Sequence, residues 1–294
     1  MKYAFIESCR GDYPIKLMCR VLGLSRPGYY AWRTREPSEQ AKRRESIGER
    51  LEALYYAFKR RYGARRLTEE LNEEGIACSE NYIAEIMRER GLKALNGKGF
   101  RYQRRVESMT QVKENVLGRN FSSDAPNRKW VTDITYIKVG RTWAYLAVVL
   151  DLYSRKVVGW SLETHMRESL ILGALEMALQ RREFSDGLLL HSDRGVQYRG
   201  NEYQQWLRDL CFVPSMSRKG NCWDNAVMES FFARLKVELI YPENYRTVDA
   251  LRAGLFEYLE IFYNRQRRHS SLGYTAPAGY ELQFHQSNVS TMRG

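Results

Sequence analysis

The segment from His191 to Tyr198 has the sequence HSDRGVQY and directly follows three consecutive leucines, Leu188–Leu190. A short apolar run bounded by a turn predicts a buried strand, and Gly195 predicts the turn that ends it. We therefore expect Asp193 at the carboxyl edge of a strand, where a substrate can reach it. His191 shares its side of this strand, either as a buried core residue or as a catalytic one.

A second acid, Asp133, lies upstream within WVTDITYIKV, from Trp130 to Val139. The β-branched and aromatic residues around it predict a strand with the acid in its middle. Two further strands are predicted at Trp143–Leu150 and Lys156–Ser161, which gives an antiparallel meander. Helices and strands alternate after that point, so the sequence predicts an α/β fold whose mixed sheet is covered on both faces.

The third acid, Glu229, lies in a segment that predicts a helix from Asn225 to about Ile240. Apolar residues recur there at spacings of three and four, namely Met228, Phe232, Leu235 and Leu239. At about 100° per residue, Asn225, Glu229 and Lys236 fall within a sector of roughly 40° at the border of the apolar face. The alternative is that Glu229 and Lys236 are ordinary surface charges.

Together, Asp133, Asp193 and Glu229 offer only carboxylate oxygens as ligands, with no His or Cys partner. Such hard ligands suit Mg²⁺. Two ions about 3.5–4 Å apart would polarise the attacking and leaving oxygens of an in-line displacement at a phosphodiester. We therefore expect a catalytic site with two Mg²⁺ ions, for which Mn²⁺ can substitute.

These segments resemble the DDE transposase and retroviral integrase superfamily. Within it, they are most similar to the second reading frame, OrfB, of the bacterial insertion-sequence-3 family. The similarity covers nearly the whole chain and includes WVTDITY, HSDRG, Asp224-Asn225 before Glu229, Tyr263-Asn264, Arg268-His269, Leu272-Gly273 and Pro277. The resemblance implies a ribonuclease H-like catalytic core of retroviral integrase type, in which the first and fourth strands are neighbours. Asp133, Asp193 and Glu229 would be its metal-binding acids and Lys236 its basic residue.

The resemblance also implies a DNA transposase that cleaves DNA strands and transfers them at the ends of an insertion sequence. Water and then a DNA 3′-hydroxyl would be the nucleophiles. The implied partners are double-stranded DNA (element ends and target), further copies of the chain assembled on DNA, and an upstream-frame product that is fused or associated. Two alternatives are a structure-specific nuclease of the same fold and a DNA-binding regulator with a vestigial catalytic core.

The charge of the chain agrees with a nucleic-acid partner. The formal net charge is +12, and residues 1–110 hold +8 of it, with 23 Lys and Arg against 15 Asp and Glu. Five widely spaced cysteines predict neither a disulfide framework nor a zinc site. Because no signal peptide or long apolar run is present, we expect a cytoplasmic, nucleoid-associated protein with no membrane partner.

The N-terminal part is predicted to be all-α, with two helix-turn-helix modules. Residues 1–37 form the first, and residues 38–95 combine a long helix with the second as a DNA-binding module. A helical hairpin, used for packing or dimerisation, is the alternative reading of each. A basic linker arm is expected over residues 96–126, and the catalytic core with its C-terminal helix over 127–283.

Basic residues in the arm and near the C-terminus are the remaining DNA-binding candidates. In the arm, cations alternate with aromatic residues, and Lys contacts to phosphates release counterions. The alternative is a solvated linker and a solvated basic tail. The candidates are Lys98, Arg101, Arg104, Arg105 and Arg268, in addition to Lys236.

Overall fold

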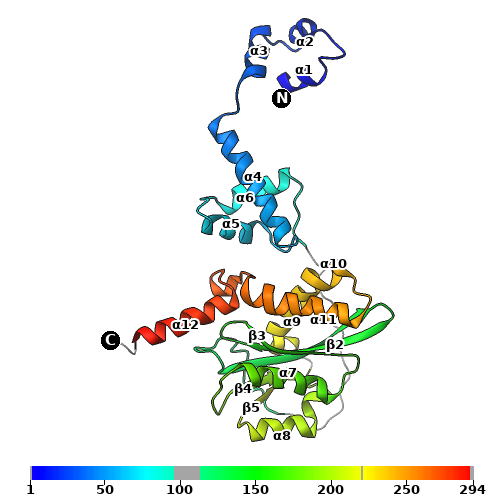
Figure 1. Cartoon of the computed structure of the whole chain (residues 1–294), viewed down its shortest axis with the longest axis vertical. Coiled ribbons are helices and arrows are strands. Elements are labelled where there is room, and N and C mark those ends of the chain that lie inside the picture. Colours follow the sequence, from blue (N-terminus) through cyan, green and yellow to red (C-terminus); the bar gives the residue numbers. More distant parts are fainter. Residues whose placement is uncertain (1, 96–112, 220, 292–294) are drawn as a thin grey trace.

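The structure is a computed structural model that describes residues 2–95, 113–219 and 221–291 (Figure 1). Two helical units and a larger α/β part follow one another along the longest axis of the molecule. Four of the predicted DNA-binding residues lie outside the described residues, namely Lys98, Arg101, Arg104 and Arg105.

A five-stranded mixed sheet forms the centre of the α/β part, with the strand order β3-β2-β1-β4-β5. The predicted antiparallel meander is confirmed, and it consists of β1 (Lys129–Val139), β2 (Thr142–Asp151) and β3 (Val157–Glu163). β4 (Leu189–Ser192) pairs in parallel with β1, and β5 (Val213–Met216) pairs in parallel with β4. The first and fourth strands are therefore neighbours, as expected for the ribonuclease H-like fold.

Helices cover both faces of this sheet (Figure 1). α7 (Glu168–Arg181) and α8 (Asn201–Asp209) pack on one face, while α9 (Ala226–Leu235) packs on the other. Successive side chains of a strand point to opposite faces. Trp130 of β1 accordingly belongs to the apolar cluster of α7 and α8, whereas Val131 belongs to the cluster of α9.

The N-terminal unit consists of α1 (Lys2–Ser8), α2 (Ile15–Val21) and α3 (Arg26–Thr34). α2 and α3 confirm the helix-turn-helix pattern predicted there, while α1 was not predicted. The side chain of Ser25 accepts a hydrogen bond from the backbone N–H of Gly28 at 3.1 Å and so caps α3. A small apolar core of its own holds this unit together.

The second helical unit consists of α4 (Glu39–Ala57), α5 (Ala64–Glu73) and α6 (Glu80–Glu89). The turn between α5 and α6 contains Gly75 at φ +82°, in the left-handed region that favours glycine. Ser79 caps α6 by accepting a hydrogen bond from the backbone N–H of Tyr82 at 3.3 Å. The second helix-turn-helix pattern therefore lies where the sequence predicted it.

The acidic residues of α6 contact arginines of the same unit. Glu85 and Glu89 lie 3.4 and 2.8 Å from Nη2 of Arg44 on α4, and Glu80 lies 2.9 Å from Nε of Arg65 on α5. Because α6 uses its charged side within the protein, these contacts support a packing role for this helix over reading of DNA bases.

The second unit is joined to the α/β part by buried contacts. The hydroxyl of Tyr62 donates to the carbonyl of Gln266 at 3.1 Å and accepts from the backbone N–H of Arg268 at 2.9 Å. Arg61 donates from Nε to the carbonyl of Glu238 at 3.1 Å. One apolar cluster is shared by the two parts and includes Leu51, Leu67, Ile83, Leu239 and Phe262.

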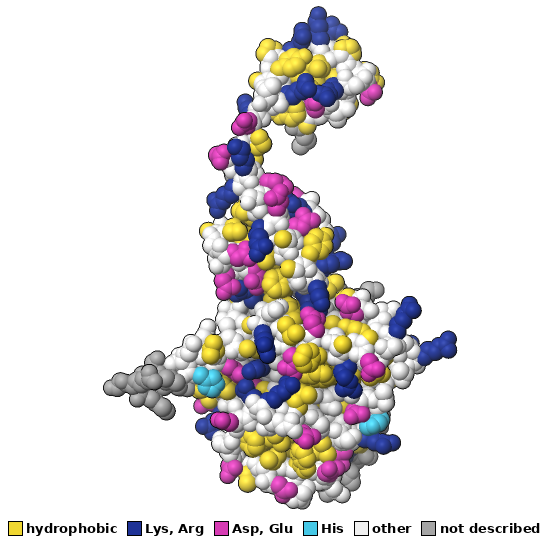
Figure 2. All heavy atoms as spheres, in the orientation of Figure 1, with side chains coloured by type: hydrophobic (Ala, Val, Ile, Leu, Met, Phe, Trp, Pro, Cys, Tyr) yellow, Lys and Arg dark blue, Asp and Glu magenta, His cyan; other side chains and the backbone are white. Residues whose placement is uncertain are grey.

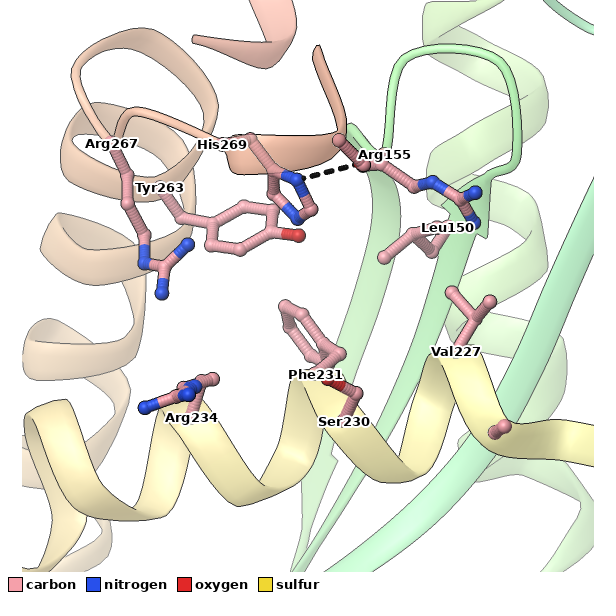
Figure 3. Close-up of a pocket in the computed structure, with 11 residues that line it drawn as sticks. Leu150, Arg155, Val227, Ser230, Phe231, Arg234, Tyr263, Arg267 and His269 are labelled. Carbon is pink, nitrogen blue, oxygen red and sulfur yellow. Dashed lines mark hydrogen bonds between the residues drawn. The ribbon is translucent and has the colours of Figure 1, made fainter. Parts of the chain in front are cut away.

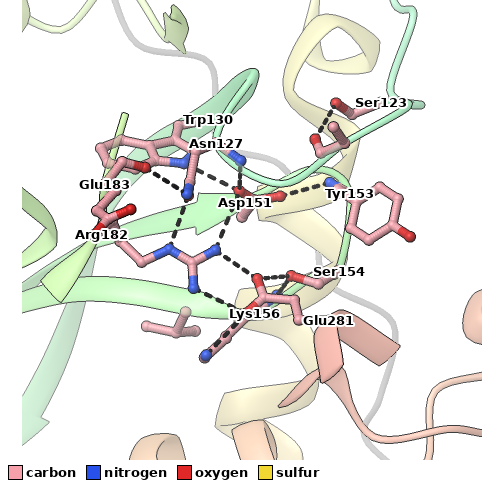
Figure 4. A network of polar contacts seen from close by, with 12 residues as sticks. Ser123, Asn127, Trp130, Asp151, Tyr153, Ser154, Lys156, Arg182, Glu183 and Glu281 are labelled. Carbon is pink, nitrogen blue, oxygen red and sulfur yellow. Dashed lines mark hydrogen bonds and ion pairs between the residues drawn. The ribbon is translucent and has the colours of Figure 1, made fainter. Parts of the chain in front are cut away.

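A buried polar network fastens α12 (Pro277–Thr291) to the sheet (Figure 4). Asp151, at the end of β2, accepts a hydrogen bond from the indole N–H of Trp130 at 3.2 Å. The guanidinium of Arg182 lies 3.8 Å from Asp151 and donates to both carboxylate oxygens of Glu281 in α12, at 2.6 and 2.8 Å. The C-terminal helix is thereby tied to the end of α7 and to β2.

Two helices change from α to π-helical geometry before they end. The helix predicted from Asn225 to about Ile240 is continuous, but η3 (Lys236–Ile240) is a π-helix. Further along the chain, α11 (Val248–Phe256) is followed by a second π-helix, η4 (Glu257–Tyr263). The predicted extent of the first helix is therefore confirmed, while its last residues have π-helical and not α-helical geometry.

The two π-helices meet at one buried ion pair, and the single turn α10 (Tyr241–Glu243) connects the segments. Glu238 accepts hydrogen bonds from Arg267 at 2.7 and 2.8 Å and from the hydroxyl of Tyr258 at 2.9 Å. Apolar spacing predicts a helix but not a buried acid whose partner lies 29 residues further along the chain. The departure from α geometry occurs where this pair has to be accommodated.

His191 is fully buried and joins β4 to the β5 segment. Its Nδ1 is hydrogen-bonded to Oγ of Ser215 at 2.8 Å, and its Nε2 to Oγ of Ser217 at 3.1 Å. Burial lowers the pKa of His191 from 6.5 to about 4, so the folded protein keeps the imidazole neutral. Of the two interpretations of this residue, the structure supports the core histidine.

Because the folded protein keeps His191 neutral, we expect the protein to lose stability at mildly acidic pH. Below its ordinary pKa of 6.5 the unfolded chain binds a proton that the folded chain excludes down to about pH 4, so stability falls as pH falls. From this group alone we expect the free energy of unfolding to drop by about 2 kcal/mol between pH 6.5 and 5. Urea denaturation of the wild type and His191→Gln at both pH values measures it. An equally steep pH dependence in the variant would contradict the assignment.

A second prediction concerns Gly159 in β3, which lies against α7. A Cβ there would come within 2.1 Å of the carbonyl oxygen of Ala174 and 2.8 Å of the backbone nitrogen of Ala178. We expect Gly159→Ala to lower the free energy of unfolding by about 1–3 kcal/mol, because helix and strand must move apart. Gly173→Ala at the same contact is the control, since its Cβ meets only the side chain of Ser161, at 3.2 Å from Oγ and 3.5 Å from Cβ. Equal stability of both variants would refute this explanation.

Candidate active site

The parallel pairing of β1 with β4 brings Asp133 and Asp193 to the same edge of the sheet. The pairing ends with Val131 opposite His191, and Asp133 and Asp193 each follow two residues further along, Asp193 just past the end of β4. Both side chains are partly buried. The register confirms the expected pairing of the first and fourth strands, and this pairing places the two acids near the same end of β4.

Backbone N–H groups orient both carboxylates. Oδ1 of Asp133 accepts a hydrogen bond from the backbone N–H of Ile134 at 2.8 Å, and Oδ1 of Asp193 accepts one from Gly195 at 2.7 Å. A Cβ on Gly195 would lie 2.9 Å from that same oxygen. The glycine predicted to form the turn thus also leaves room for the carboxylate.

Both acids lie close enough to the buried Tyr198 to affect the pKa of its phenol. Burial raises the pKa of the Tyr198 phenol well above its usual value, and the negative charges of Asp133 and Asp193 raise it further. The hydroxyl lies 3.1 Å from Oγ1 of Thr132, the residue before Asp133. Since both carboxylates act on one buried phenol, negative charge is concentrated at this edge of the sheet.

Glu229 lies in the first turn of α9, the helix that packs on β1. It is half-buried, and burial raises the pKa of its carboxyl group. It has no hydrogen bond or ion pair with any residue that the structure describes. Within the described ranges, no three His, Cys, Asp or Glu side chains surround one metal position. In the described residues the three acids therefore do not form one group that could hold a metal ion.

Lys236 is buried beneath the same edge, with only 8% of its surface exposed. Its Nζ lies 5.2 Å from the centre of the Tyr136 ring on β1. Burial lowers the pKa of Lys236, and the negative charge of Asp133 opposes this shift. The alternative of an ordinary surface charge is therefore wrong for Lys236.

Asp224 was not predicted as a functional residue, yet it organises the start of α9. The side chain is fully buried and accepts hydrogen bonds from Arg218 at 2.8 and 2.9 Å, Arg119 at 2.7 Å and Asn115 at 2.8 Å. The bond from Arg218 is the largest cause that holds the pKa of Asp224 well below its usual range. This network anchors the chain five residues before Glu229.

The next residue, Asn225, is also buried, and neither polar atom of its side chain has a hydrogen-bond partner among the described residues. Buried polar groups are almost always paired. The helical spacing placed Asn225 in one sector with Glu229 and Lys236, but residue spacing alone does not reveal the burial of Asp224 and Asn225.

Arg268, a predicted DNA-binding residue, contacts the second helical unit. It donates to Glu70 at 2.5 Å, pairs with Glu73 and donates to the carbonyl of Tyr274 at 3.2 Å. Any contact of Arg268 with DNA would require it to leave these two glutamates of α5.

No helix within the described part of the chain is long and apolar enough to cross a membrane. This finding agrees with the sequence, in which no long apolar run was found.

Comparisons with protein families place these features in context. Two models, each described as "Integrase core domain", match residues 123–222 and 210–277, and one described as "HTH-like domain" matches residues 42–99. Among solved structures, a chain of the simian T-cell lymphotropic virus intasome is similar at 17% identity with a TM-score of 0.46. That alignment covers 79% of this chain and 74% of the other.

Curated relatives match over almost their full length. "Transposase InsF for insertion sequence IS3A" of Escherichia coli (strain K12) is 42% identical, with 96% of this chain and 98% of that protein covered. "Insertion element IS600 uncharacterized 31 kDa protein" of Shigella sonnei is 38% identical, with 92% and 99% covered. Given this identity over the whole chain and an integrase-type core, the protein belongs to the insertion-sequence-3 family of transposases.

Proposed function

We propose that this protein is a DNA transposase that cleaves DNA strands and joins them at the ends of an insertion sequence. Membership of a transposase family with an integrase core makes the chain a polynucleotidyl transferase. The observation that supports the proposal most strongly is the pairing of β1 with β4, which places Asp133 and Asp193 near the same end of β4.

We further propose that Asp133, Asp193 and Glu229 are the DDE acids, which hold the metal ions. The donor set fits Mg²⁺, since it consists of carboxylates that are partly buried at one edge of the sheet. When bound, two Mg²⁺ ions would polarise the attacking and leaving oxygens of a phosphodiester in an in-line displacement. Glu229, which has no partner among the described residues, would complete the ligand set by turning its side chain toward β1.

The residues around the acids would hold them in place. Backbone N–H groups of Ile134 and Gly195 fix one oxygen of each aspartate. The Asp224 network would fix the start of α9 and hence the position from which Glu229 reaches the site. Burial raises the pKa of the Glu229 carboxyl group, and a bound cation would favour its charged form, with the proton released to solvent.

DNA contacts are proposed for three regions. Lys236 lies close to Asp133 and would contact the phosphates of the DNA end. The arm with Lys98, Arg101, Arg104 and Arg105 would follow the backbone. Figure 2 shows Lys and Arg gathered at the tip of the N-terminal unit, so we assign recognition of the element ends to the helix-turn-helix of α2 and α3.

We also propose the division of the chain into residues 1–37, 38–95, 96–126 and 127–283. The first two segments contain only helices, and the last contains the whole sheet. Assembly of several copies on DNA and association with an upstream-frame product complete the proposal, in the cytoplasm at the nucleoid.

The central prediction concerns the three acids. We expect Asp133→Asn, Asp193→Asn and Glu229→Gln each to reduce cleavage and joining by at least about a hundredfold, roughly 2.7 kcal/mol of barrier, while DNA binding persists. The assay uses duplexes that carry the element's ends, with Mg²⁺ or Mn²⁺, and scores nicking and joining separately. Glu202→Gln, an exposed acid on α8, is the control.

Each alternative function predicts a different result in this assay. A structure-specific nuclease would cut without joining, and a DNA-binding regulator would bind the ends without cutting. If Glu229→Gln cuts at the wild-type rate, Glu229 is not part of the catalytic site. If only the two aspartate variants lose activity, the catalytic centre consists of two carboxylates.

A further prediction concerns Lys236. Lys236→Met keeps most of the buried stem but removes the charge beside Asp133, so we expect weaker engagement of the DNA end and a smaller effect as salt rises. End joining is measured over a series of salt concentrations. Lys138→Ala removes an exposed charge from the same strand, β1, and is the control. Equal joining by Lys236→Met and wild type at low salt would contradict the role.

A further inference from the structure

A cavity of about 220 Å³ lies between α9 and the C-terminal segment that follows η4 (Figure 3). Leu150, Val227 and Phe231 form apolar parts of its wall, and the buried Tyr263 ring lies among them. The volume is below the roughly 300–1,000 Å³ of sites for drug-sized ligands. Its size suits one nucleotide unit or a smaller group and excludes a duplex.

The polar part of this cavity is cationic. Arg155, Arg234 and Arg267 line it, and none of the lining residues is an acid. Glu238 offsets the charge of Arg267. Arg234 is exposed and forms no hydrogen bond or ion pair with a described residue, so its charge remains available at the rim.

Arg155 presents an unsatisfied donor. One end of its guanidinium, Nη2, donates to the carbonyl of Phe121 at 2.9 Å, whereas Nη1 is buried with no hydrogen-bond partner among the described residues. Arg155 has φ +61° in the turn between β2 and β3, so an uncommon backbone conformation carries this side chain. An oxygen of a ligand would satisfy a donor that folded proteins seldom leave unpaired.

A neighbouring histidine, His269, responds to this positive charge. Burial, together with the charges of Arg267, Arg155 and Arg66, lowers the pKa of His269 to about 4. His269 lines the cavity and is therefore neutral at neutral pH. The arginines are thus the cations of the site, and the field that they create favours an anion.

The cavity is separate from the candidate metal site, although α9 contributes to both. At about 100° per residue, Ser230 and Arg234 lie on one flank of α9, and Glu229 and Lys236 point roughly 130° away from them. The apolar face of the helix lies between these flanks and packs on the sheet. A ligand in the cavity would therefore not occupy the place of the metal ions.

We propose that this cavity binds a phosphate group carried on a nucleoside, from a DNA strand or from a free nucleotide. Figure 3 shows Arg234 and Arg267 at one side of the cavity and Arg155 at the other, with Tyr263 and Phe231 between them. The phosphate lies at the Arg234–Arg267 side, where planar guanidinium groups suit its oxygens. The ring of the nucleoside packs on the aromatic side chains, and Arg155 donates to it from the far side. This site goes beyond the proposed catalytic function, since no metal-site residue takes part.

Calorimetric titration of the full-length protein in EDTA tests the proposal. The ligands are deoxyadenosine monophosphate, deoxyadenosine without phosphate, and a short 5′-phosphorylated single strand. Arg234→Glu reverses the exposed charge at the rim, and Ser230→Phe fills the opening without a change of charge. Arg208→Glu, an exposed arginine on α8, is the matched control for charge. Thermal unfolding confirms that each variant is folded.

We expect the phosphorylated ligand to bind, deoxyadenosine not to bind, and both cavity variants to weaken binding by at least about tenfold, with Arg208→Glu unchanged. Binding of the strand alone identifies DNA as the source, and binding of the mononucleotide identifies a free nucleotide. Wild-type affinity in both cavity variants, equal loss in Arg208→Glu, or no binding of any phosphorylated ligand overturns the site. Asp133→Asn separates it from the catalytic proposal, because that variant should bind the nucleotide normally.

Discussion

The parallel pairing between β1 and β4 is the interaction on which the candidate site depends. Asp133 and Asp193 are far apart in the sequence, and only the pairing of these two strands places them near the same end of β4. Two like charges at one edge repel each other, so the fold has to hold them there. It does so with backbone N–H donors to each carboxylate and with the cation of Lys236 near Asp133. A site held in this way is electrostatically ready for a divalent cation.

Buried charge also joins the parts of the molecule. The Glu238–Arg267 pair connects η3, which continues α9, to the C-terminal segment. Arg61 of the second helical unit donates a hydrogen bond to the carbonyl of Glu238 and so joins that unit to the same place. Removing one partner of a buried pair leaves the other charge uncompensated, which is costly. Buried contacts therefore connect the helix that contains Glu229 to the helix-turn-helix unit.

Much of the fold was predictable because local physical rules apply to it. The three meander strands followed from β-branched and aromatic runs, and the caps at Ser25 and Ser79 followed from side chains that satisfy free N–H groups at helix starts. The two aspartates of the site were also predictable from their places on strands. The burial of Lys236 and the Asp224 network were not, since burial depends on segments that are distant in the sequence.

By itself, the sequence determined the order and type of most helices and strands, the positive charge of the chain and the identity of its three candidate acids, because these depend on residue type and near-neighbour spacing. Only the tertiary structure decided that the acidic residues of α6 form ion pairs within the protein, that Arg268 pairs with Glu70, and that three arginines line one cavity. Contacts of this kind join residues up to about two hundred positions apart. Their geometry comes from packing, which no local pattern encodes.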